Sequence, residues 1–335
     1  MSPHWIHGLE RGKHGALSLA QRALELRAGA MPERCDGARI ASVFLNPSFR
    51  TKTSMDFAAA ALGAHMVSLD PGATSWGWEC REGAVMNEDK AEHMIDAVGV
   101  LSEMADLLSM RSFASLTHQE DDAKDITLST FVRYSSKPVV NLESALYHPL
   151  QGLADTATWL DHLGPDLKGK SITLTWAPHP KALPTAVANQ VLLSAALQGM
   201  DITLAHPEEF SLPPFIVEQG KTIAQSHGGS IQQSYDQVDA LRGANVVVAK
   251  SWSGWQGYGN REKEAVIRSQ YHNWMIDGEK MAHTNQAGFM HCLPVRRNVV
   301  VHDEVIDSPQ SWTKETAGLR MWTAMALLET MFGEM

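Results

Sequence analysis

The sequence predicts an α/β protein made of two doubly wound parallel-sheet domains that are joined by interdomain helices. Short runs rich in Val, Ile and Leu alternate with longer stretches of helical periodicity, which is typical of parallel sheets with right-handed crossovers. This alternation occurs as two separate series. The chain has 335 residues, more than one hydrophobic core usually serves, so two domains are expected.

The first series begins with a helical pattern over residues 14–30. Apolar runs then predict strands at residues 40–45, 65–69, 107–110 and 139–142. Helical patterns between them predict helices after residue 48, near residues 88–103 and near residues 125–134. This half of the chain therefore accounts for one complete sheet.

The second series predicts strands at residues 171–176, 201–205, 245–249 and 288–291, with helices near residues 183–198, 217–227 and 260–270. Pro149 begins a helix that is expected to reach about residue 163 and to bridge the two series. Residues 319–332 predict a closing helix. We therefore expect domains at residues 1–150 and 151–312, and a C-terminal helix at 313–335 that packs back on the first domain.

The composition is that of an ordinary globular protein, with 44% hydrophobic and 20% charged residues. A net charge of −10 argues against nucleic acid or an anionic membrane as a partner. No apolar run reaches the length of a membrane span, and the N-terminus lacks a basic region followed by an apolar core. Three cysteines, Cys35, Cys80 and Cys292, show no metal-ligand spacing, so we expect a cytoplasmic protein without a metal site.

Residues 43–54 carry the strongest local signal for a ligand site. An apolar run ends at Asn46-Pro47, and a helical pattern with hydroxyl and cationic side chains begins there. The free N–H groups of a helix start bind anions, and Ser48, Arg50 and Thr51 would add donors and charge. An ordinary N-capped helix shows much the same pattern, so the segment alone leaves both interpretations open.

Other polar side chains follow the expected strands, at the edge where open α/β sheets bind their ligands. They are Arg111, Glu143, His148, Lys250 and the His-Cys-Leu-Pro-Val-Arg-Arg-Asn segment at residues 291–298. Each has an ordinary alternative: Arg111 as a surface arginine, His148 as a helix cap and Cys292 as a small buried hydrophobe. Only their combination points to a site.

Two common classes of nucleotide-binding enzyme are disfavoured. No glycine-rich dinucleotide fingerprint follows any expected strand, and the turn after residue 176 reads Ala-Pro-His-Pro instead. No Gly-x-x-x-x-Gly-Lys-Ser/Thr loop occurs either. A nicotinamide oxidoreductase and a P-loop enzyme are therefore disfavoured, and a different phosphorylated ligand is needed.

Three separated motifs resemble those of the carbamoyltransferases, the family that contains aspartate and ornithine transcarbamylase. They are Ser-Phe-Arg-Thr-Lys-Thr at residues 48–53, His-Pro-Leu-Gln at 148–151 and His-Cys-Leu-Pro at 291–294. The resemblance covers nearly the whole chain, and each motif follows an expected strand. The third motif is similar to the ornithine side of the family rather than to the aspartate side.

The resemblance implies an enzyme without a cofactor, whose first domain binds carbamoyl phosphate and whose second domain binds the acceptor. The catalytic residues that it implies are Arg50, Thr51, Arg111, His148, Gln151 and Cys292. It adds Ser48, Phe49, Trp76, Leu293 and Arg320 as further contacts of carbamoyl phosphate. An amine would attack the carbonyl carbon while fixed donors stabilise the oxygen, with no covalent enzyme intermediate. The resemblance also implies a homotrimer with shared active sites, in which the loop that carries Trp76 contributes to the active site of a neighbouring subunit.

Residue 250 indicates which amine is attacked. Ornithine transcarbamylases have an aspartate and a Ser-Met-Gly loop here, whereas this chain has Lys250-Ser251-Trp252. A lysine would repel a free α-ammonium, so the α-amine of the substrate is expected to be acylated. The chain thus resembles the branch that makes N-acyl-citrulline from N-acetyl- or N-succinyl-ornithine in arginine biosynthesis. That branch implies acyl-ornithine contacts at Ala91, Glu143, His179, Lys250, Leu293 and Arg296.

The acyl group depends on a few further positions. Enzymes of the acetyl type have a glutamate where this chain has Ala91, unless the alignment shifts by one onto Glu92, and a lysine where it has Val300. A glutamate near the acyl tail would repel a succinyl carboxylate, and a small neutral residue would admit it. Arg296 or Arg297 would then pair with that carboxylate. On this basis the sequence slightly favours succinyl.

Two alternatives stay open beside this interpretation. One is an ornithine carbamoyltransferase that uses free ornithine, against which Lys250 argues. The other is a catalytically silent subunit of the same family, which would be expected to lose its phosphate ligands. Ser48, Arg50 and Thr51 are all present, which disfavours a silent subunit.

Overall fold

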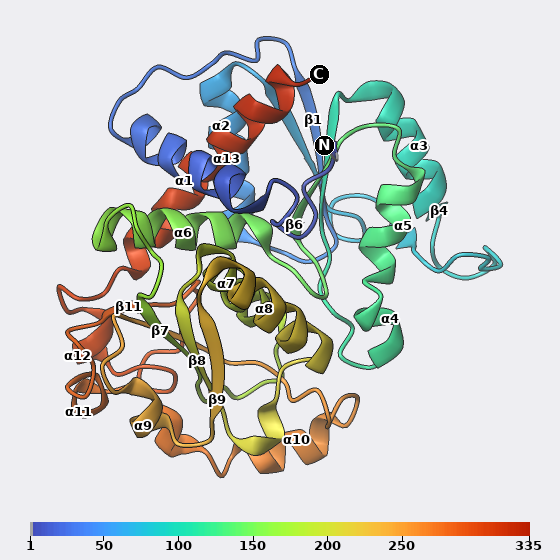
Figure 1. The fold of residues 1–335 in the computed structure, drawn as a ribbon. Coiled ribbons are helices and arrows are strands. Elements are labelled where there is room, and N and C mark those ends of the chain that lie inside the picture. The colour runs from blue at the N-terminus through green and yellow to red at the C-terminus, as the bar shows by residue number, and fades with distance from the viewer. Residues whose placement is uncertain (1–2) are drawn as a thin grey trace.

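The structure, a computed structural model, describes residues 3–335 and contains one large parallel sheet in each half of the chain (Figure 1). The first sheet has the order β2-β1-β5-β6, with β1 at Arg39–Phe44, β2 at His65–Leu69, β5 at Leu107–Arg111 and β6 at Val139–Glu143. The second has the order β11-β10-β7-β8-β9, with β7 at Ser171–Trp176, β8 at Asp201–Ala205, β9 at Ser230–Ser234, β10 at Val246–Lys250 and β11 at Gly288–Met290. All neighbouring strands are parallel, which confirms the predicted fold class.

Helices flank both sheets. The first half contains α1 (Gly12–Arg27), α2 (Phe49–Leu62), α3 (Met94–Met104), α4 (Gln119–Ala123) and α5 (Ile126–Tyr134). The second contains α7 (Ala186–Gln198), α8 (Pro214–His227), α9 (Gln237–Leu241), α10 (Arg261–Arg268), α11 (Gly278–Met281) and α12 (Asp303–Ile306), with 3-10 turns at Glu208–Phe210 and His272–Trp274. Within residues 3–335, every helix is too short or too polar to cross a bilayer.

Two further helices connect the halves (Figure 1): α6 at Pro149–Leu163 and α13 at Thr313–Gly333. α6 belongs to both hydrophobic cores, because Leu150 and Leu153 pack with the first sheet and Ala157 and Trp159 with the second. α13 returns to the first half, where its residues 324–328 join the core that contains β1 and α2. α6 and α13 therefore pack together as a wall where the two halves of the chain meet.

The sequence explains where the central elements begin and end. All residues of β5 and β6 are buried, which accounts for their mostly apolar composition. α2 begins where the Ser48 hydroxyl accepts a hydrogen bond from the Thr51 N–H at 3.2 Å, and it ends at Gly63, whose φ of 77° is left-handed. A serine cap and a glycine stop thus set this helix in position.

Strand order places a topological switch point in each sheet. The first sheet grows outward from β1 to β2 and then, on the other side of β1, to β5 and β6. The second grows from β7 to β8 and β9, and then on the other side of β7 to β10 and β11. Ligands of open α/β sheets bind at the carboxyl ends of the strands beside such points. Residues at the ends of β1, β5, β7 and β10 should therefore meet in one site.

Several predicted boundaries were wrong. The helix expected from residue 88 begins only at Met94, because polar residues 88–93 form a loop with a short strand, β4 (Glu92–His93), that pairs with β3 (Trp78–Glu79). The edge strand β9 was missed, because Ser-Ile-Gln-Gln-Ser has only one apolar residue. Arg111 lies inside β5 rather than after it, paired with Phe44 of β1.

Candidate active site

A cavity of about 500 Å³ lies at the carboxyl ends of the strands of both sheets. Its polar and charged lining consists of Ser48, Arg50, Thr51, Arg111, Glu143, His148, His179, Lys250, Cys292 and Arg320. Phe49 and Leu293 also line it. The two switch points therefore bring most of the predicted site residues together, from segments far apart in the sequence.

Thr51, in the first turn of α2, is the hub of the hydrogen bonds in this cavity. Its side-chain oxygen accepts from Arg320 Nη2 at 2.9 Å and from Arg111 Nη1 at 3.4 Å. Both contacts use lone pairs of the hydroxyl, so its own hydrogen stays available for a ligand. The N-terminal amides and dipole of α2 add to the positive potential at the same place.

A second polar group links β5, β6 and α6. Arg111 Nη1 donates to Glu143 Oε2, and the same oxygen lies 3.3 Å from His148 Nε2. Burial, followed by the cations Arg320 and Arg111, lowers the pKa of His148 well below its usual value. The ring is therefore neutral at pH 7 with a single N–H, which the adjacent carboxylate favours on Nε2.

The cavity is strongly cationic. Of its lining residues, Arg50, Arg111, Lys250 and Arg320 carry positive charge, and Glu143 is the carboxylate among them. Burial lowers the pKa of Arg320 to about 10, with Arg111 as the next cause. Within residues 3–335, the buried Nε atoms of Arg111 and Arg320 have no hydrogen-bond partner. Buried cations with unused donors favour a multiply charged anion as ligand.

Gln151 lies behind the lining of this cavity, on the buried side of α6. Its Nε2 donates to Asp155 Oδ1 at 2.9 Å, and its Oε1 accepts from Arg320 Nη1 at 3.5 Å. Sequence reasoning missed Asp155. The signal was present, because Asp155 stands four residues after Gln151 and therefore on the same face of the helix.

The segment after β11 forms a tight turn against the cavity. His291 Nδ1 accepts a hydrogen bond from the Leu293 N–H at 2.9 Å, and Leu293 has a φ of 53°, which is uncommon outside glycine. Burial raises the pKa of the Cys292 thiol, so it is neutral at pH 7. This thiol is not activated as a nucleophile.

The second half supplies Lys250 and His179, which end β10 and follow β7. Arg296 Nε donates to His179 Nε2 at 3.4 Å, and His179 Nδ1 lies 3.0 Å from the Lys181 backbone N and 2.9 Å from the Lys181 carbonyl oxygen. Burial lowers the pKa of His179, which keeps the ring neutral. Of the two arginines considered for an acyl carboxylate, Arg296 thus contacts a lining residue, His179, but it does not itself line the cavity.

Arg297 forms ion pairs outside the cavity. Its Nη1 donates to Asp303 at 2.7 Å and to Asp307 at 2.6 Å, in an exposed ion-pair group next to α12. Val300 is 1% exposed and packs in the core beneath the second sheet. Neither side chain lines the cavity in the described chain.

Trp76 and Ala91 also lie outside the cavity lining in this chain. Both belong to the loop between β2 and α3, which projects from the first sheet at the right of Figure 1. Trp76 is 61% exposed, and its Nε1 donates to Glu92 Oε2 at 2.5 Å. Trp76 and Glu92 therefore occupy the same part of an exposed loop.

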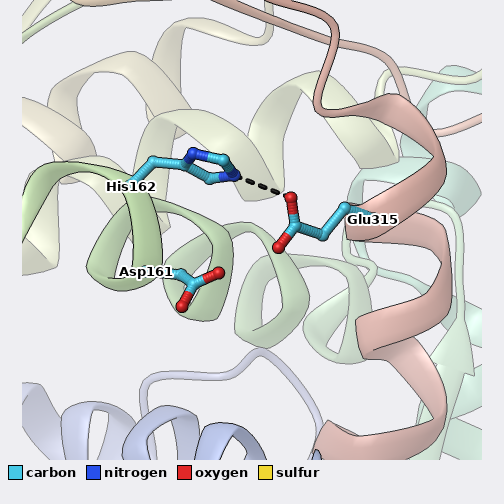
Figure 2. A group of neighbouring side chains, drawn as sticks. All are labelled: Asp161, His162 and Glu315. Atoms are coloured by element: carbon cyan, nitrogen blue, oxygen red, sulfur yellow. Dashed lines mark hydrogen bonds and ion pairs between the residues drawn. The ribbon is translucent and has the colours of Figure 1, made fainter. Parts of the chain in front are cut away.

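A separate polar group lies outside the cavity, where α6 meets α13 (Figure 2). Asp161, His162 and Glu315 are close enough to share a metal ion, and His162 Nε2 lies 2.7 Å from Glu315 Oε2. Arg27 of α1 already donates to Asp161 and to Glu315, each at 2.7 Å. The group is therefore an ion-pair network that links α1, α6 and α13.

Comparison with known proteins gives consistent matches over the whole chain. Residues 7–161 match the family model "Aspartate/ornithine carbamoyltransferase, carbamoyl-P binding domain", and residues 183–331 match its Asp/Orn binding domain. The chain is 41% identical to N-acetylornithine carbamoyltransferase of Xanthomonas campestris pv. campestris, over 99% of this chain and 98% of the relative. It is 36% identical to N-succinylornithine carbamoyltransferase of Bacteroides fragilis, over 86% of each.

Solved structures show the same similarity. An acetylornithine transcarbamylase complexed with acetylcitrulline matches with a TM-score of 0.95 and 38% identity, over 98% of each chain. A substituted form of N-acetyl-L-ornithine transcarbamylase, complexed with carbamyl phosphate and N-succinyl-L-norvaline, matches with the same TM-score of 0.95 and identity of 38%, over 98% of this chain and 99% of that one.

Proposed function

The chain belongs to the aspartate/ornithine carbamoyltransferase family of enzymes, and on that premise we propose that it carbamoylates the δ-amine of an N-acylated ornithine. Carbamoyl phosphate is the donor in this proposal, and N-acyl-citrulline and phosphate are the products. The observation that carries the proposal is the cavity itself. At the start of α2 it is lined by positively charged side chains that suit an anion, and on the other side it is lined by Lys250 of the second half.

In this proposal the phosphate of the donor lies at the first turn of α2, on its backbone N–H groups and Arg50. The carbonyl oxygen accepts from the Thr51 hydroxyl and Arg111, and it shares the single N–H of His148 Nε2 with Glu143 Oε2. These groups are fixed before the reaction by the contacts to Arg320 and Glu143, so they stabilise developing negative charge without reorganising.

The amino group of the carbamoyl moiety faces Gln151 and the backbone of Cys292 and Leu293. The neutral δ-amine then attacks the carbonyl carbon, so that a C–N bond forms. The C–O bond to phosphate breaks, and its electron pair leaves on the phosphate. The proton lost by nitrogen passes to phosphate or to water. The neutral thiol of Cys292 supports a reaction without a covalent enzyme intermediate.

Lys250 is the reason for proposing an acylated acceptor. Its ammonium group pairs with the α-carboxylate of the acceptor, and it repels a free α-ammonium. At about 4 Å in a partly buried site, such a repulsion costs on the order of 4 kcal/mol, which is large enough to decide between free and acylated ornithine.

For the acyl group we propose acetyl, although Ala91 favours succinyl. Glu92, rather than Ala91, accepts the hydrogen bond of Trp76. We further propose that the chain forms a homotrimer in which the loop of Trp76 reaches a neighbour's cavity, and Glu92 would then accompany the indole. A carboxylate there disfavours a succinyl tail by like-charge repulsion. The identity of 41% to an N-acetylornithine enzyme supports the same choice.

The proposal is tested by measuring phosphate release from carbamoyl phosphate with N-acetyl-ornithine, N-succinyl-ornithine and free ornithine in parallel. We expect the acetyl compound to be used best and free ornithine hardly at all. Turnover of free ornithine at a comparable or higher rate would refute the acylated acceptor, and faster turnover of the succinyl compound would refute only the acetyl choice. Gel filtration with light scattering tests the trimer.

We also place this reaction in arginine biosynthesis in the cytoplasm. Cys35, Cys80 and Cys292 are free thiols, which suits a reducing compartment. Deleting the gene should cause a requirement for arginine that citrulline relieves. Growth of the deletion strain without either amino acid would contradict this assignment.

A further inference from the structure

We propose that Asp155 is a positioning residue that holds the side-chain amide of Gln151 in one orientation, with Oε1 turned toward the donor site. Through Gln151 it would enable recognition of the amino group of carbamoyl phosphate. This inference rests on the proposed function, in which Gln151 Oε1 accepts a hydrogen bond from the amino group of carbamoyl phosphate.

The orientation of Gln151 follows from the two groups on either side of its amide. Asp155 Oδ1 lies 2.9 Å from Nε2, and Arg320 Nη1 lies 3.5 Å from Oε1. The ionised carboxylate of Asp155, which predominates above about pH 7, only accepts hydrogen bonds, and a guanidinium only donates them. A flipped amide would place oxygen against oxygen on one side and N–H against N–H on the other. The observed orientation is therefore the favourable one.

Bulk solvent hardly reaches these side chains. Gln151 is 1% exposed, Asp155 is 3% exposed and Arg320 is 4% exposed. All three lie where α6 and α13 form the wall behind the cavity, and every α6 residue from Pro149 to Leu160 is buried. The amide of Gln151 consequently depends on protein groups for its orientation.

Asp155 destabilises the fold, which argues that it is present for a reason other than stability. Within residues 3–335 its Oδ2 has no hydrogen-bond partner, and burial raises its pKa to about 7. A buried carboxylate with an unsatisfied oxygen destabilises a protein, and an apolar residue of similar size is often neutral or stabilising in its place. Stability alone therefore does not explain an aspartate at this position.

Asp155 should affect binding of the carbamoyl end of the donor but not binding of its phosphate end. The carbamoyl amino group donates hydrogen bonds and needs an acceptor, which Gln151 Oε1 supplies only in the observed orientation. Inorganic phosphate has no such group and uses only the cationic end of the cavity. Asp155 should therefore affect binding of carbamoyl phosphate and leave binding of inorganic phosphate nearly unchanged.

The test compares the dissociation constants of carbamoyl phosphate and inorganic phosphate, by calorimetry at about pH 8, where Asp155 is ionised, in five variants of the protein. Asp155→Leu keeps the size of the side chain and should weaken carbamoyl phosphate binding about tenfold, the effect of one lost hydrogen bond. Inorganic phosphate binding should change less than about twofold. Asp155→Asn retains one acceptor oxygen and should give a smaller change in the same direction.

A double-mutant cycle shows whether Asp155 acts through Gln151. Gln151→Leu should weaken carbamoyl phosphate to a similar degree, and adding Asp155→Leu to it should cause little further loss. Thr158→Val is the matched control, because Thr158 is a fully buried polar residue on the same helix that contacts Ala154 and Thr316. It should leave both dissociation constants unchanged.

Equal weakening of both ligands by the Asp155 variants, or additive losses in the double variant, would overturn the inference. If Asp155→Leu does not fold, an unchanged ratio of the two dissociation constants in Asp155→Asn would overturn it equally. These binding measurements need no acceptor. Failure of the proposed function would show instead as absent turnover of acyl-ornithine in the wild-type enzyme.

Discussion

Replacing Asp155 with asparagine should make the protein more stable in mildly alkaline solution, although the side chain lies at the centre of the fold. Burial raises the pKa of Asp155 from the ordinary value of 3.8 to about 7. The folded protein therefore binds a proton more tightly than the unfolded chain across this interval, and its stability falls as the pH rises through it. Above pH 7 the full cost of ionisation is present.

The size of this cost follows from the shift. Each pKa unit corresponds to about 1.4 kcal/mol, so the ionised Asp155 costs on the order of 4 kcal/mol at about pH 8. Asparagine carries no charge and removes that cost, but it also removes the countercharge of Arg320. The attraction of Arg320 is already part of the pKa shift, so the free energy of unfolding of Asp155→Asn relative to the wild type should rise by on the order of 4 kcal/mol between pH 4 and pH 8.

Urea unfolding followed by tryptophan fluorescence measures this difference, at fixed protein concentration and at several pH values. The free energy of unfolding of Asp155→Asn minus that of the wild type should increase with pH between pH 4 and pH 7. Thr158→Val should show a difference that does not depend on pH. A pH-independent difference for Asp155→Asn, or a loss of stability that grows with pH, would refute the reasoning.

Three further predictions concern the reaction. Thr51→Val removes the hydroxyl on which Arg111 and Arg320 converge, so kcat should fall about 100-fold in a steady-state assay while the circular dichroism spectrum stays unchanged; a loss under threefold would contradict its role. Lys250→Asp should raise the ratio of kcat/KM for free ornithine over N-acetyl-ornithine at least tenfold, because the charge facing the α-nitrogen is reversed; an unchanged ratio would show that residue 250 does not read this group. Glu92→Gln should raise the use of N-succinyl-ornithine relative to N-acetyl-ornithine in competition assays, and equal changes for both would exclude a contact with the acyl tail.

The fold was largely predictable because its central strands are buried on both faces. β7 and β8 were predicted with the observed limits, since their apolar runs end abruptly at polar or glycine-containing turns. β9 escaped prediction because an edge strand carries polar residues on its exposed side. Residues 88–93 were assigned to a helix because local pattern alone does not reveal the pairing of β3 with β4.

The candidate site was predictable as a list of residues but not as a set of contacts. Glu143 was expected beside the acyl-ornithine, and in the structure its carboxylate contacts Arg111 and His148. Arg296 and Arg297 were equivalent in sequence, and only the position of Asp303 and Asp307 separates them. The identity of the acyl group and the shared site at Trp76 are predictions that the assays above test.

The sequence by itself determined the α/β class and the family, and it predicted phosphate binding at the start of α2, because these depend on local patterns and on motifs that follow strands. Tertiary structure alone decided which charges meet. Thr51, Gln151 and Arg320 come from α2, α6 and α13, and their hydrogen bonds exist only because these helices pack together between the two sheets. Burial in that wall also shifts the pKa values of His148 and Asp155. Such shifts depend on desolvation and on distances between charges, which no local pattern in the chain encodes.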